Sequence, residues 1–258
     1  FEDKYLLDKS LENLKELKGK KAAFIIGGGS VQKNGVLERA QNYLKEVNIE
    51  SVVFSGVEAD PSIETVIKGA EFLTQEQPDI IIGLGGCSAI DAAKGMWIYY
   101  EYPDSKSEEL KELFAVKKLR KKAIMVAIPT TSGTGTEITG LAVITDREKG
   151  TKYPIVSYEL TPDMAIIDGE LSASMPENVT ANTGLDALSH GVEAYASNIS
   201  ERYSDTLAKS AIELKKKNLL TAVSEGSNLE VRQAMHDASC MAGMFNNVWL
   251  GIVHSMSH

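Results

Sequence analysis

The sequence has no long apolar run, no excess of basic residues and only two cysteines. No stretch approaches the roughly 18 to 20 apolar residues that a membrane-spanning helix needs, which argues against a transmembrane segment. Lys and Arg number 27 against 36 Asp and Glu, and the formal charge of −9 disfavours binding of DNA or RNA. The run Lys215–Lys217 fits a solvated helix face better than a binding patch. Two cysteines cannot form a disulfide framework, and Phe1–Lys4 lacks the features of a secretory signal, so we expect a cytoplasmic protein.

What is present is an ordinary globular composition, 43% hydrophobic and 24% charged, in a chain of 258 residues. In the first half, short apolar runs alternate with segments of helical periodicity, which predicts a parallel sheet covered by helices. After about Asp168 only helical patterns continue. We therefore expect an α/β domain over residues 1–170 and a helical domain over residues 171–258. The expected strands are 22–26, 51–54, 79–84 and 123–128. In the first domain we expect one helix over 36–47, a second that begins with Asp60 as its cap and Pro61, and a third from the Gly85–Gly86 turn through Tyr100. In the second domain the expected helices are 178–196, 203–223 and 229–248.

Two glycine turns follow predicted strands in the first half. Gly27–Ser30 comes after the first strand, and Gly85–Ser88 comes after the third strand and opens a helix. Backbone that approaches a pyrophosphate leaves no room for a Cβ, and a helix N-terminus offers free N–H groups and a favourable dipole. Neither turn matches the G-x-G-x-x-G fingerprint. Phosphate binding and a simple tight turn both remain open for each.

A third segment, Pro129–Glu137, follows the fourth predicted strand with five hydroxyl side chains and two glycines in nine residues. Small donors of this kind can hold sugar hydroxyls or an amide, although a surface loop has the same composition. All three segments leave the carboxyl ends of strands in one sheet, where open α/β sheets bind ligands. Together they favour a nucleotide site at that edge.

The first glycine turn also bears on the choice of dinucleotide. Sites specific for NAD usually place a carboxylate after an early strand, where it accepts the ribose hydroxyls. Here the turn offers Gly28 and Ser30, followed by Lys33, and no carboxylate. We therefore expect NADP(H) to be preferred over NAD(H).

The four histidines point to a possible metal site in the second half. Asp186 and His190 are four residues apart, as are His254 and His258, so each pair shares one face of a predicted helix. Carboxylate oxygen and imidazole nitrogen suit a borderline ion such as Fe²⁺ or Zn²⁺. A capping or surface contact is the alternative for each pair. His236 has no such companion, and we expect it to be structural.

Four segments in this order resemble the iron-containing (group III) alcohol dehydrogenase family. They are Gly85–Lys94, Pro129–Glu137, Thr183–His190 and Gly251–His258, and the likeness extends over nearly the whole chain. Within the family the chain is most similar to the branch of NADPH-dependent butanol dehydrogenases and broad aldehyde reductases. The resemblance implies hydride transfer between NADP(H) and a primary alcohol or aldehyde, with Fe²⁺ or Zn²⁺ bound.

The resemblance also implies a fold and roles for single residues. The fold is a Rossmann-like parallel-sheet domain followed by a helical metal-binding domain, as in dehydroquinate synthase-like proteins. Asp186, His190 and His254 match metal ligands, and His258 matches a histidine near the metal that is a candidate proton carrier. The positions matched to dinucleotide binding are Gly28, Gly29, Ser30, Asp60, Gly85, Gly86, Cys87, Ser88, Thr130, Thr131, Thr134 and Lys152.

The chain departs from the family pattern in two places. Cys87 stands where the family has the third glycine of a Gly-Gly-Gly-Ser turn. The family's fourth metal ligand is a histidine that would lie beyond His258, so we expect a chain truncated at its C-terminus. Two alternatives stay open: a zinc-dependent polyol dehydrogenase of the glycerol type, and a non-catalytic dinucleotide-binding fragment. The expected partner is a small alcohol or aldehyde, and we expect no binding of nucleic acid or membrane. Whether the protein forms a homo-oligomer stays open.

Overall fold

The computed structural model describes residues 20–243 and 248–257. The chain divides into two compact units, and each unit is made of two separate segments of the chain. The first unit comprises Phe1–Pro129 and Gly140–Ile166, and the second comprises Thr130–Thr139 and Ile167–His258. The serine- and threonine-rich segment after the fourth strand therefore groups with the helices of the second unit, which its position in the sequence did not indicate.

The first unit contains a five-stranded sheet in which all pairs are parallel, in the order β2-β1-β3-β4-β7. This confirms the predicted parallel α/β architecture. Apart from Lys21 at the start of β1, every residue of β1 and β3 is apolar and buried, because helices cover both faces of these strands. Ile26 pairs with Leu84, and Gly85 pairs with Pro129, so three strands end at the same edge. The strands are β1 (Lys21–Ile26), β2 (Glu50–Phe54), β3 (Ile80–Gly85), β4 (Ile124–Pro129) and β7 (Met164–Ala165).

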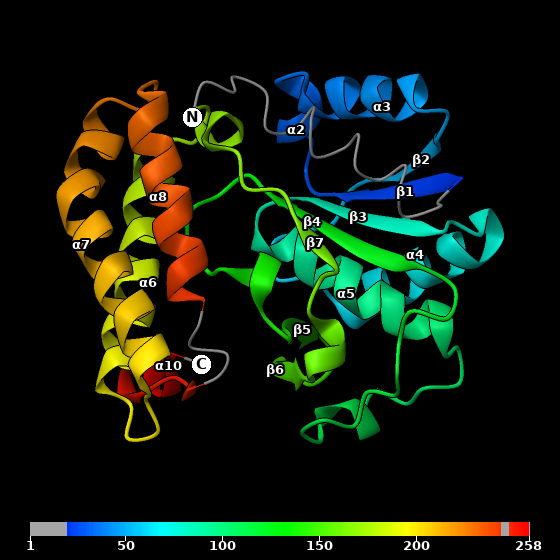
Figure 1. Cartoon of the computed structure of the whole chain (residues 1–258). Helices are drawn as coiled ribbons and strands as arrows, with labels where there is room; N and C mark the ends of the chain where they lie inside the picture. The colour runs from blue at the N-terminus through cyan, green and yellow to red at the C-terminus, as the bar shows by residue number, and fades with distance from the viewer. Residues whose placement is uncertain (1–19, 244–247, 258) are drawn as a thin grey trace. The chain divides into compact units, whose positions relative to one another are not determined.

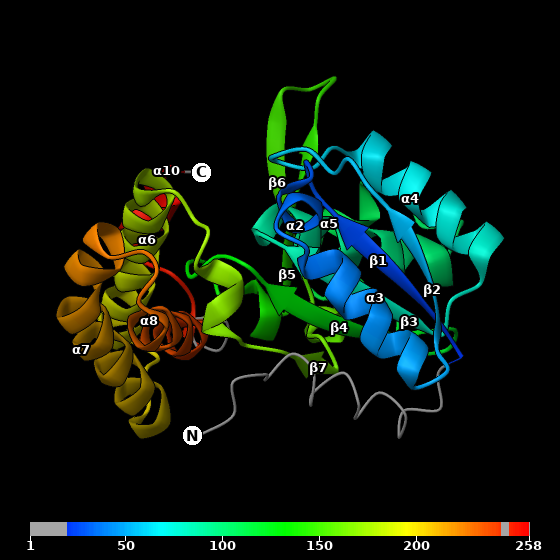
Figure 2. The same cartoon turned by 90° about the horizontal axis from the view of Figure 1, so that it is seen from above.

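Helices lie on both faces of this sheet, with α2 and α3 on one face and α4 and α5 on the other (Figures 1 and 2). Helix α5 is buried at every residue from Ala89 to Glu101, and Trp97 is fully buried in the main hydrophobic cluster. The tight packing of α5 fixes the turn that precedes it. The helices are α2 (Ser30–Lys33), α3 (Val36–Glu46), α4 (Ile63–Glu76) and α5 (Cys87–Glu101).

The start of α4 corrects one sequence-based expectation. Asp60 was expected to cap this helix, but the cap is Ser62, whose hydroxyl accepts a hydrogen bond from the N–H of Thr65. Asp60 lies outside the helix with a left-handed backbone (φ 54°). Its carboxylate is therefore available for another contact, described below.

The sequence analysis did not predict the antiparallel hairpin of β5 (Leu141–Asp146) and β6 (Thr151–Val156). Two buried charged residues of α5 hold it. The Asp91 carboxylate accepts the N–H of Val143 at 2.9 Å, and the Lys94 ammonium donates to the carbonyl of Leu141 at 2.8 Å. Since both lie in the Gly85–Lys94 segment, part of that motif has a structural role.

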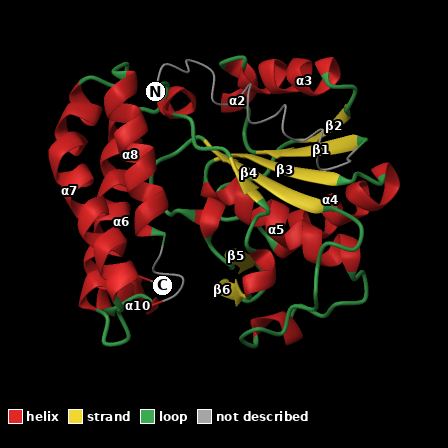
Figure 3. Cartoon of the chain, viewed as in Figure 1, coloured by secondary structure: helices red, strands yellow, loops and turns green. Residues whose placement is uncertain are grey.

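The described residues of the second unit form helices and loops only (Figure 3). Small residues allow α6, α7 and α8 to pack closely: Ala187, Ala211 and Ala242 form one buried cluster. A Cβ on Gly184 of α6 would overlap the Leu219 side chain of α7. The helices are α6 (Glu177–Ala196), α7 (Arg202–Ser224), α8 (Leu229–Ala242) and α10 (Ile252–Ser257).

The interpretation of Lys215–Lys217 as a solvated helix face is wrong for its first residue. Lys215 is fully buried in α7, and its ammonium donates to the carbonyls of Ser132 and Met235 and to the hydroxyl of Ser239, at 2.8 to 3.0 Å. Three acceptors match the three donors of an ammonium group, which makes this burial possible. Among the helices that the structure describes, none has the length and apolar character needed to cross a membrane.

Candidate functional site

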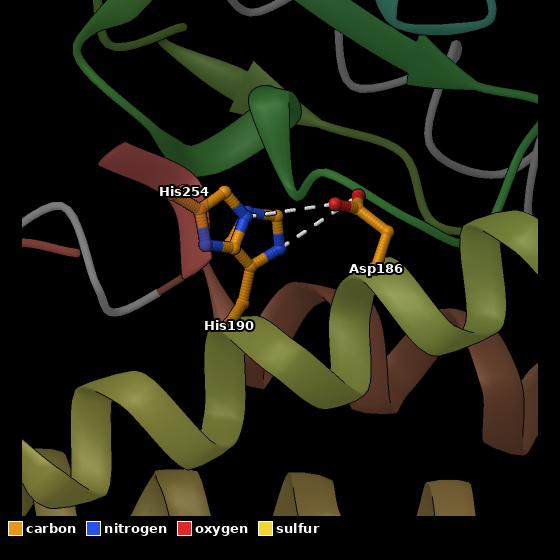
Figure 4. Close-up of side chains that lie close together, drawn as sticks. All are labelled: Asp186, His190 and His254. Atoms are coloured by element: carbon orange, nitrogen blue, oxygen red, sulfur yellow. Dashed lines mark ion pairs between the residues drawn. The ribbon is translucent and has the colours of Figure 1, made fainter. Parts of the chain in front are cut away.

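One group of possible metal ligands lies in the second unit, where Asp186 and His190 of α6 meet His254 of α10 (Figure 4). One ligand atom from each residue lies within 4.8 Å of the others. Asp186 Oδ2 is 3.8 Å from His190 Nδ1, and Asp186 Oδ1 is 3.6 Å from His254 Nε2. These gaps are too long for hydrogen bonds, but two atoms about 2.1 Å from a shared tetrahedral ion would be about 3.4 Å apart. The group thus has nearly the dimensions of a metal site.

Burial and ring geometry support the same interpretation. His190 is 4% exposed and His254 is 8% exposed. Their rings stack with centroids 4.3 Å apart and planes 18° apart, so both rings turn an edge toward Asp186 (Figure 4). Two imidazoles and one carboxylate are a donor set that Fe²⁺ and Zn²⁺ both use. The residues present therefore fit a borderline divalent ion.

A residue that the sequence analysis did not select, Glu193, lies behind His254. Its Oε2 is 2.5 Å from His254 Nδ1, and its Oε1 accepts the N–H of Val253 at 2.6 Å. Burial raises the pKa of the Glu193 carboxyl, but hydrogen bonds from His254 and from the backbone outweigh it and leave the pKa below its usual value. Glu193 is therefore a carboxylate at neutral pH. Its spacing of seven residues from Asp186 was the available signal, since it repeats one helical face.

The first unit holds the two glycine turns at the carboxyl ends of β1 and β3. Gly85 has φ 149°, and a Cβ there would lie 3.1 Å from the Cβ of Ala89, so this position needs glycine. Gly86 caps α5 with φ −72°, and Cys87 is the first residue of the helix. Cys87 is not among the residues with positive φ, so its backbone conformation in this turn does not require glycine. The N-terminus of α5 thus keeps the geometry that anions favour.

Three further residues matched to dinucleotide binding lie together in the first unit. Asp60 forms an ion pair with Lys152 at 2.8 Å, and the N–H of Asp60 donates to the hydroxyl of Ser88 at 3.3 Å. Asp60 comes before α4, Ser88 lies in α5 and Lys152 lies in β6, so segments distant in sequence converge. The structure therefore connects Asp60 and Lys152 to the Gly85–Ser88 turn.

The segment Thr130–Thr139 is not a surface loop, which was one of the two interpretations that its sequence left open. Thr130, Ser132, Thr136 and Glu137 are all at most 9% exposed. Inside the second unit, a Cβ on Gly135 would come within 2.9 Å of the backbone of α8. The segment is therefore packed on the helices. Thr131 and Thr134 are partly exposed at the positions that the resemblance assigns to the nucleotide.

The structure bears differently on the roles expected of the two remaining histidines, His258 and His236. His258 lies outside the described residues, so its expected proton-carrying role stays a prediction. His236 is fully buried in α8, and burial lowers its pKa to about 3. A histidine that stays neutral in the interior fits the expected structural role.

Comparison with known proteins identifies the family. Residues 3–169 match the family described as iron-containing alcohol dehydrogenase, and residues 180–258 match the C-terminal part of the Fe-containing alcohol dehydrogenase family. The chain belongs to the iron-containing alcohol dehydrogenase family. Both units thus fall within one family of oxidoreductases, as the sequence motifs implied.

Individual relatives agree with this assignment. The chain is 50% identical over 250 residues to the NADPH-dependent butanol dehydrogenase of Clostridium saccharobutylicum, covering 96% of this chain and 64% of that protein. It is 40% identical to the 1-propanol dehydrogenase of Citrobacter freundii, of which it covers 63%. The structure of a 1,3-propanediol oxidoreductase has a TM-score of 0.92, with 38% identity over 98% of this chain and 65% of the other. The chain thus spans about two thirds of the length of these relatives.

Proposed function

We propose that this chain carries the dinucleotide- and metal-binding parts of an alcohol dehydrogenase that transfers hydride between NADP(H) and a primary alcohol or aldehyde. The observation that carries the proposal is the convergence of Asp186, His190 and His254 in a member of this family. The ion would be Fe²⁺, the metal in the family's name. When bound, it supplies Lewis-acid polarisation of the substrate oxygen.

The residues of the chain have separate tasks in this proposal. Asp186, His190 and His254 hold the ion, and the burial of the two imidazoles limits competition from water. The hydride chemistry belongs to the nicotinamide, which the protein binds and orients. His258 is the proposed carrier of the proton that the alcohol loses or the aldehyde gains, because imidazole titrates near neutral pH.

We also propose that the dinucleotide binds through the residues that the resemblance matched to it. The N-terminus of α5 beyond Gly85 offers N–H groups to the pyrophosphate. The pair of Asp60 and Lys152, joined to Ser88, would lie near the ribose units. The 50% identity to a butanol dehydrogenase named as NADPH-dependent supports NADP(H). The full proposed set is Gly28, Gly29, Ser30, Asp60, Gly85, Gly86, Cys87, Ser88, Thr130, Thr131, Thr134 and Lys152.

The two alternatives are less well supported. The family models describe iron-containing enzymes, which does not favour a zinc-dependent polyol dehydrogenase. A non-catalytic dinucleotide-binding fragment would have no use for a cluster of metal-ligand type that includes two buried imidazoles. The assignment to 1–170 as the dinucleotide domain and 171–258 as the metal domain, the cytoplasmic location and the lack of nucleic-acid or membrane binding stay predictions, and a homo-oligomeric state stays open.

The substitution Asp186→Ala tests the proposed function. It should remove bound metal and NADPH-linked reduction of butyraldehyde while NADPH binding changes less than about threefold, since the glycine turns belong to the other unit. Metal analysis, the aldehyde assay and NADPH fluorescence titration measure the three properties. Unchanged metal content in this variant would show that Asp186 and His190 make only a helix-face contact.

A further inference from the structure

Helix α6 presents three functional side chains on one face rather than two. Asp186, His190 and Glu193 follow one another at spacings of four and three residues, which places them on successive turns. Glu193 is 8% exposed, and a buried carboxylate needs hydrogen-bond donors. It finds them on α10, the helix that carries His254.

The Glu193 carboxylate divides its two oxygens between the side chain and the backbone of α10. Oε2 faces His254 Nδ1 at 2.5 Å, and Oε1 accepts the N–H of Val253 at 2.6 Å. A Cβ on Gly251 would lie 3.1 Å from Oε1, so glycine leaves the carboxylate room to approach. Glu193 thus anchors both the beginning of α10 and the ring of His254.

The ring stack does not determine which nitrogen of His254 faces Asp186. Turning the imidazole by 180° about its bond to Cβ would leave it stacked on His190 but would exchange nitrogen for carbon along both edges. The contact with Glu193 breaks this symmetry. An ionised carboxylate only accepts hydrogen bonds, so Nδ1 must carry a proton. In a neutral ring, Nε2 then keeps its lone pair, and Nε2 is the atom 3.6 Å from Asp186 Oδ1.

We infer that Glu193 is a positioning residue for the metal centre: it holds the tautomer and orientation of His254 in which Nε2 is the metal ligand. This inference rests on the proposed function, because it takes the group of Asp186, His190 and His254 to bind a metal. A carboxylate hydrogen-bonded to the far nitrogen of a histidine ligand also raises the basicity of the ligating nitrogen. Glu193 therefore contributes to metal affinity without touching the ion.

Glu193→Gln is the sharpest variant because it preserves size but replaces one acceptor oxygen by an NH₂ donor and removes the charge. If the amide oxygen keeps the N–H of Val253, the NH₂ group faces His254 Nδ1 and forces the ring proton onto Nε2, where it competes with the metal. If the amide is turned, its NH₂ group meets the N–H of Val253 instead. Either way, one of the two contacts is lost.

Ser197→Ala is the matched control. Ser197, at the C-terminal end of α6, donates to the carbonyl of Val248 at 2.6 Å, so it also ties α6 to the chain near α10. The hydrogen bonds described for its hydroxyl, to the carbonyl of Val248 and from the N–H of Ile199, do not involve His254. Ser197→Ala therefore removes a neighbouring tether while leaving the imidazole contact intact, and it separates general tethering from control of the ring.

The experiment measures Co²⁺ affinity by competition with a chelator in the wild type and in E193Q, E193D, S197A and D186A. We expect E193Q to bind Co²⁺ about 10 to 100 times more weakly, S197A to stay within about threefold of the wild type, and E193D to recover part of the loss. In ¹⁵N spectra of the metal-free protein, His254 should be protonated at Nδ1 in the wild type and at Nε2 in E193Q. Circular dichroism and NADPH binding report whether each variant folds.

The outcomes separate this inference from the function on which it rests. If D186A binds Co²⁺ as tightly as the wild type does, the proposed metal site itself is wrong. If D186A loses binding while E193Q stays within threefold of the wild type and keeps the Nδ1 proton, the site stands and the role of Glu193 is overturned. Equal losses in E193Q and S197A, with an unchanged tautomer, would overturn it too, since they would indicate tethering alone.

Discussion

The two units of this protein build their candidate sites from different parts of the chain. In the first unit the candidate site is formed mainly by the backbone. Gly85 adopts φ 149°, and the N-terminus of α5 presents N–H groups whatever side chain follows. In the second unit side chains form the site: the buried imidazoles of His190 and His254, and the carboxylates of Asp186 and Glu193 on α6. A backbone site is sensitive to an added Cβ, whereas a side-chain site is sensitive to the loss of one donor atom.

The largest effect that tests this contrast should come from Gly85→Ala. Alanine at φ 149° is strained, and its Cβ would approach the Ala89 Cβ to 3.1 Å at the beginning of α5. We expect a loss of about 1 to 3 kcal/mol in stability and a loss of NADPH binding of at least tenfold. Co²⁺ affinity should stay near that of the wild type. Isothermal titration with each ligand checks both, and a parallel loss of Co²⁺ binding would contradict the independence of the two sites.

The second largest effect should be on the pH dependence of stability, and it comes from Lys215, which is buried in α7 of the second unit. Burial lowers its pKa to about 7, although Asp186 and Glu137 act in the opposite direction. Between pH 7 and 10.5 the unfolded chain therefore holds a proton that the folded chain has partly released, so stability should rise with pH. The slope from this one group is at most about 1.4 kcal/mol per pH unit.

Lys215→Met removes this titration. The free energy of unfolding, measured with urea at pH 7, 8 and 9, should therefore rise more with pH in the wild type than in Lys215→Met. Lys216→Met, an exposed neighbour on the same helix, serves as control and should follow the wild type. Parallel curves for the wild type and Lys215→Met would mean that the buried ammonium keeps its ordinary pKa.

The contrast between units also explains what the sequence could predict. The parallel sheet followed from apolar runs such as Ala22–Ile26, since strands buried on both faces leave a continuous signal. The hairpin of β5 and β6 was missed, because one of its strands contains Pro154, and a proline inside a short apolar run argues against a strand. Asp186 and His190 could be paired by spacing alone. His254 could be joined to them only through the family resemblance.

Other features of the site had a weak sequence signal or none. The spacing of Glu193 from Asp186 places both on one helical face, but Glu193 is one of 36 acidic residues, and only the fold shows that it meets His254. Lys215 sits in a run of three lysines, and periodicity does not show that it is the buried one. That Thr130–Thr139 packs with the helical unit depends on contacts across distant segments, such as that of Ser132 with Lys215. Local patterns carry no information about such contacts.

A third prediction sharpens the comparison at the first glycine turn. Gly28 has no positive φ, and a Cβ there would meet nothing within 4 Å, so Gly28→Asp adds a carboxylate without strain. The new charge should repel a 2′-phosphate and accept ribose hydroxyls, which shifts the ratio of kcat/KM for NADPH over NADH about tenfold or more toward NADH. Gly28→Asn controls for size. A wild-type enzyme that already favours NADH would contradict the expected NADP(H) preference.

The smallest effect is expected at the pair of Asp60 and Lys152. Both side chains are well exposed, 60% and 47%, so their 2.8 Å ion pair should add less than about 1 kcal/mol to stability. Lys152→Met should leave the melting temperature nearly unchanged, because the N–H of Asp60 keeps its hydrogen bond to Ser88. If the pair lies near the ribose units, the Kd for NADPH should still rise a few-fold. A loss of stability above about 2 kcal/mol with unchanged NADPH affinity would instead make the pair a structural contact that takes no part in dinucleotide binding.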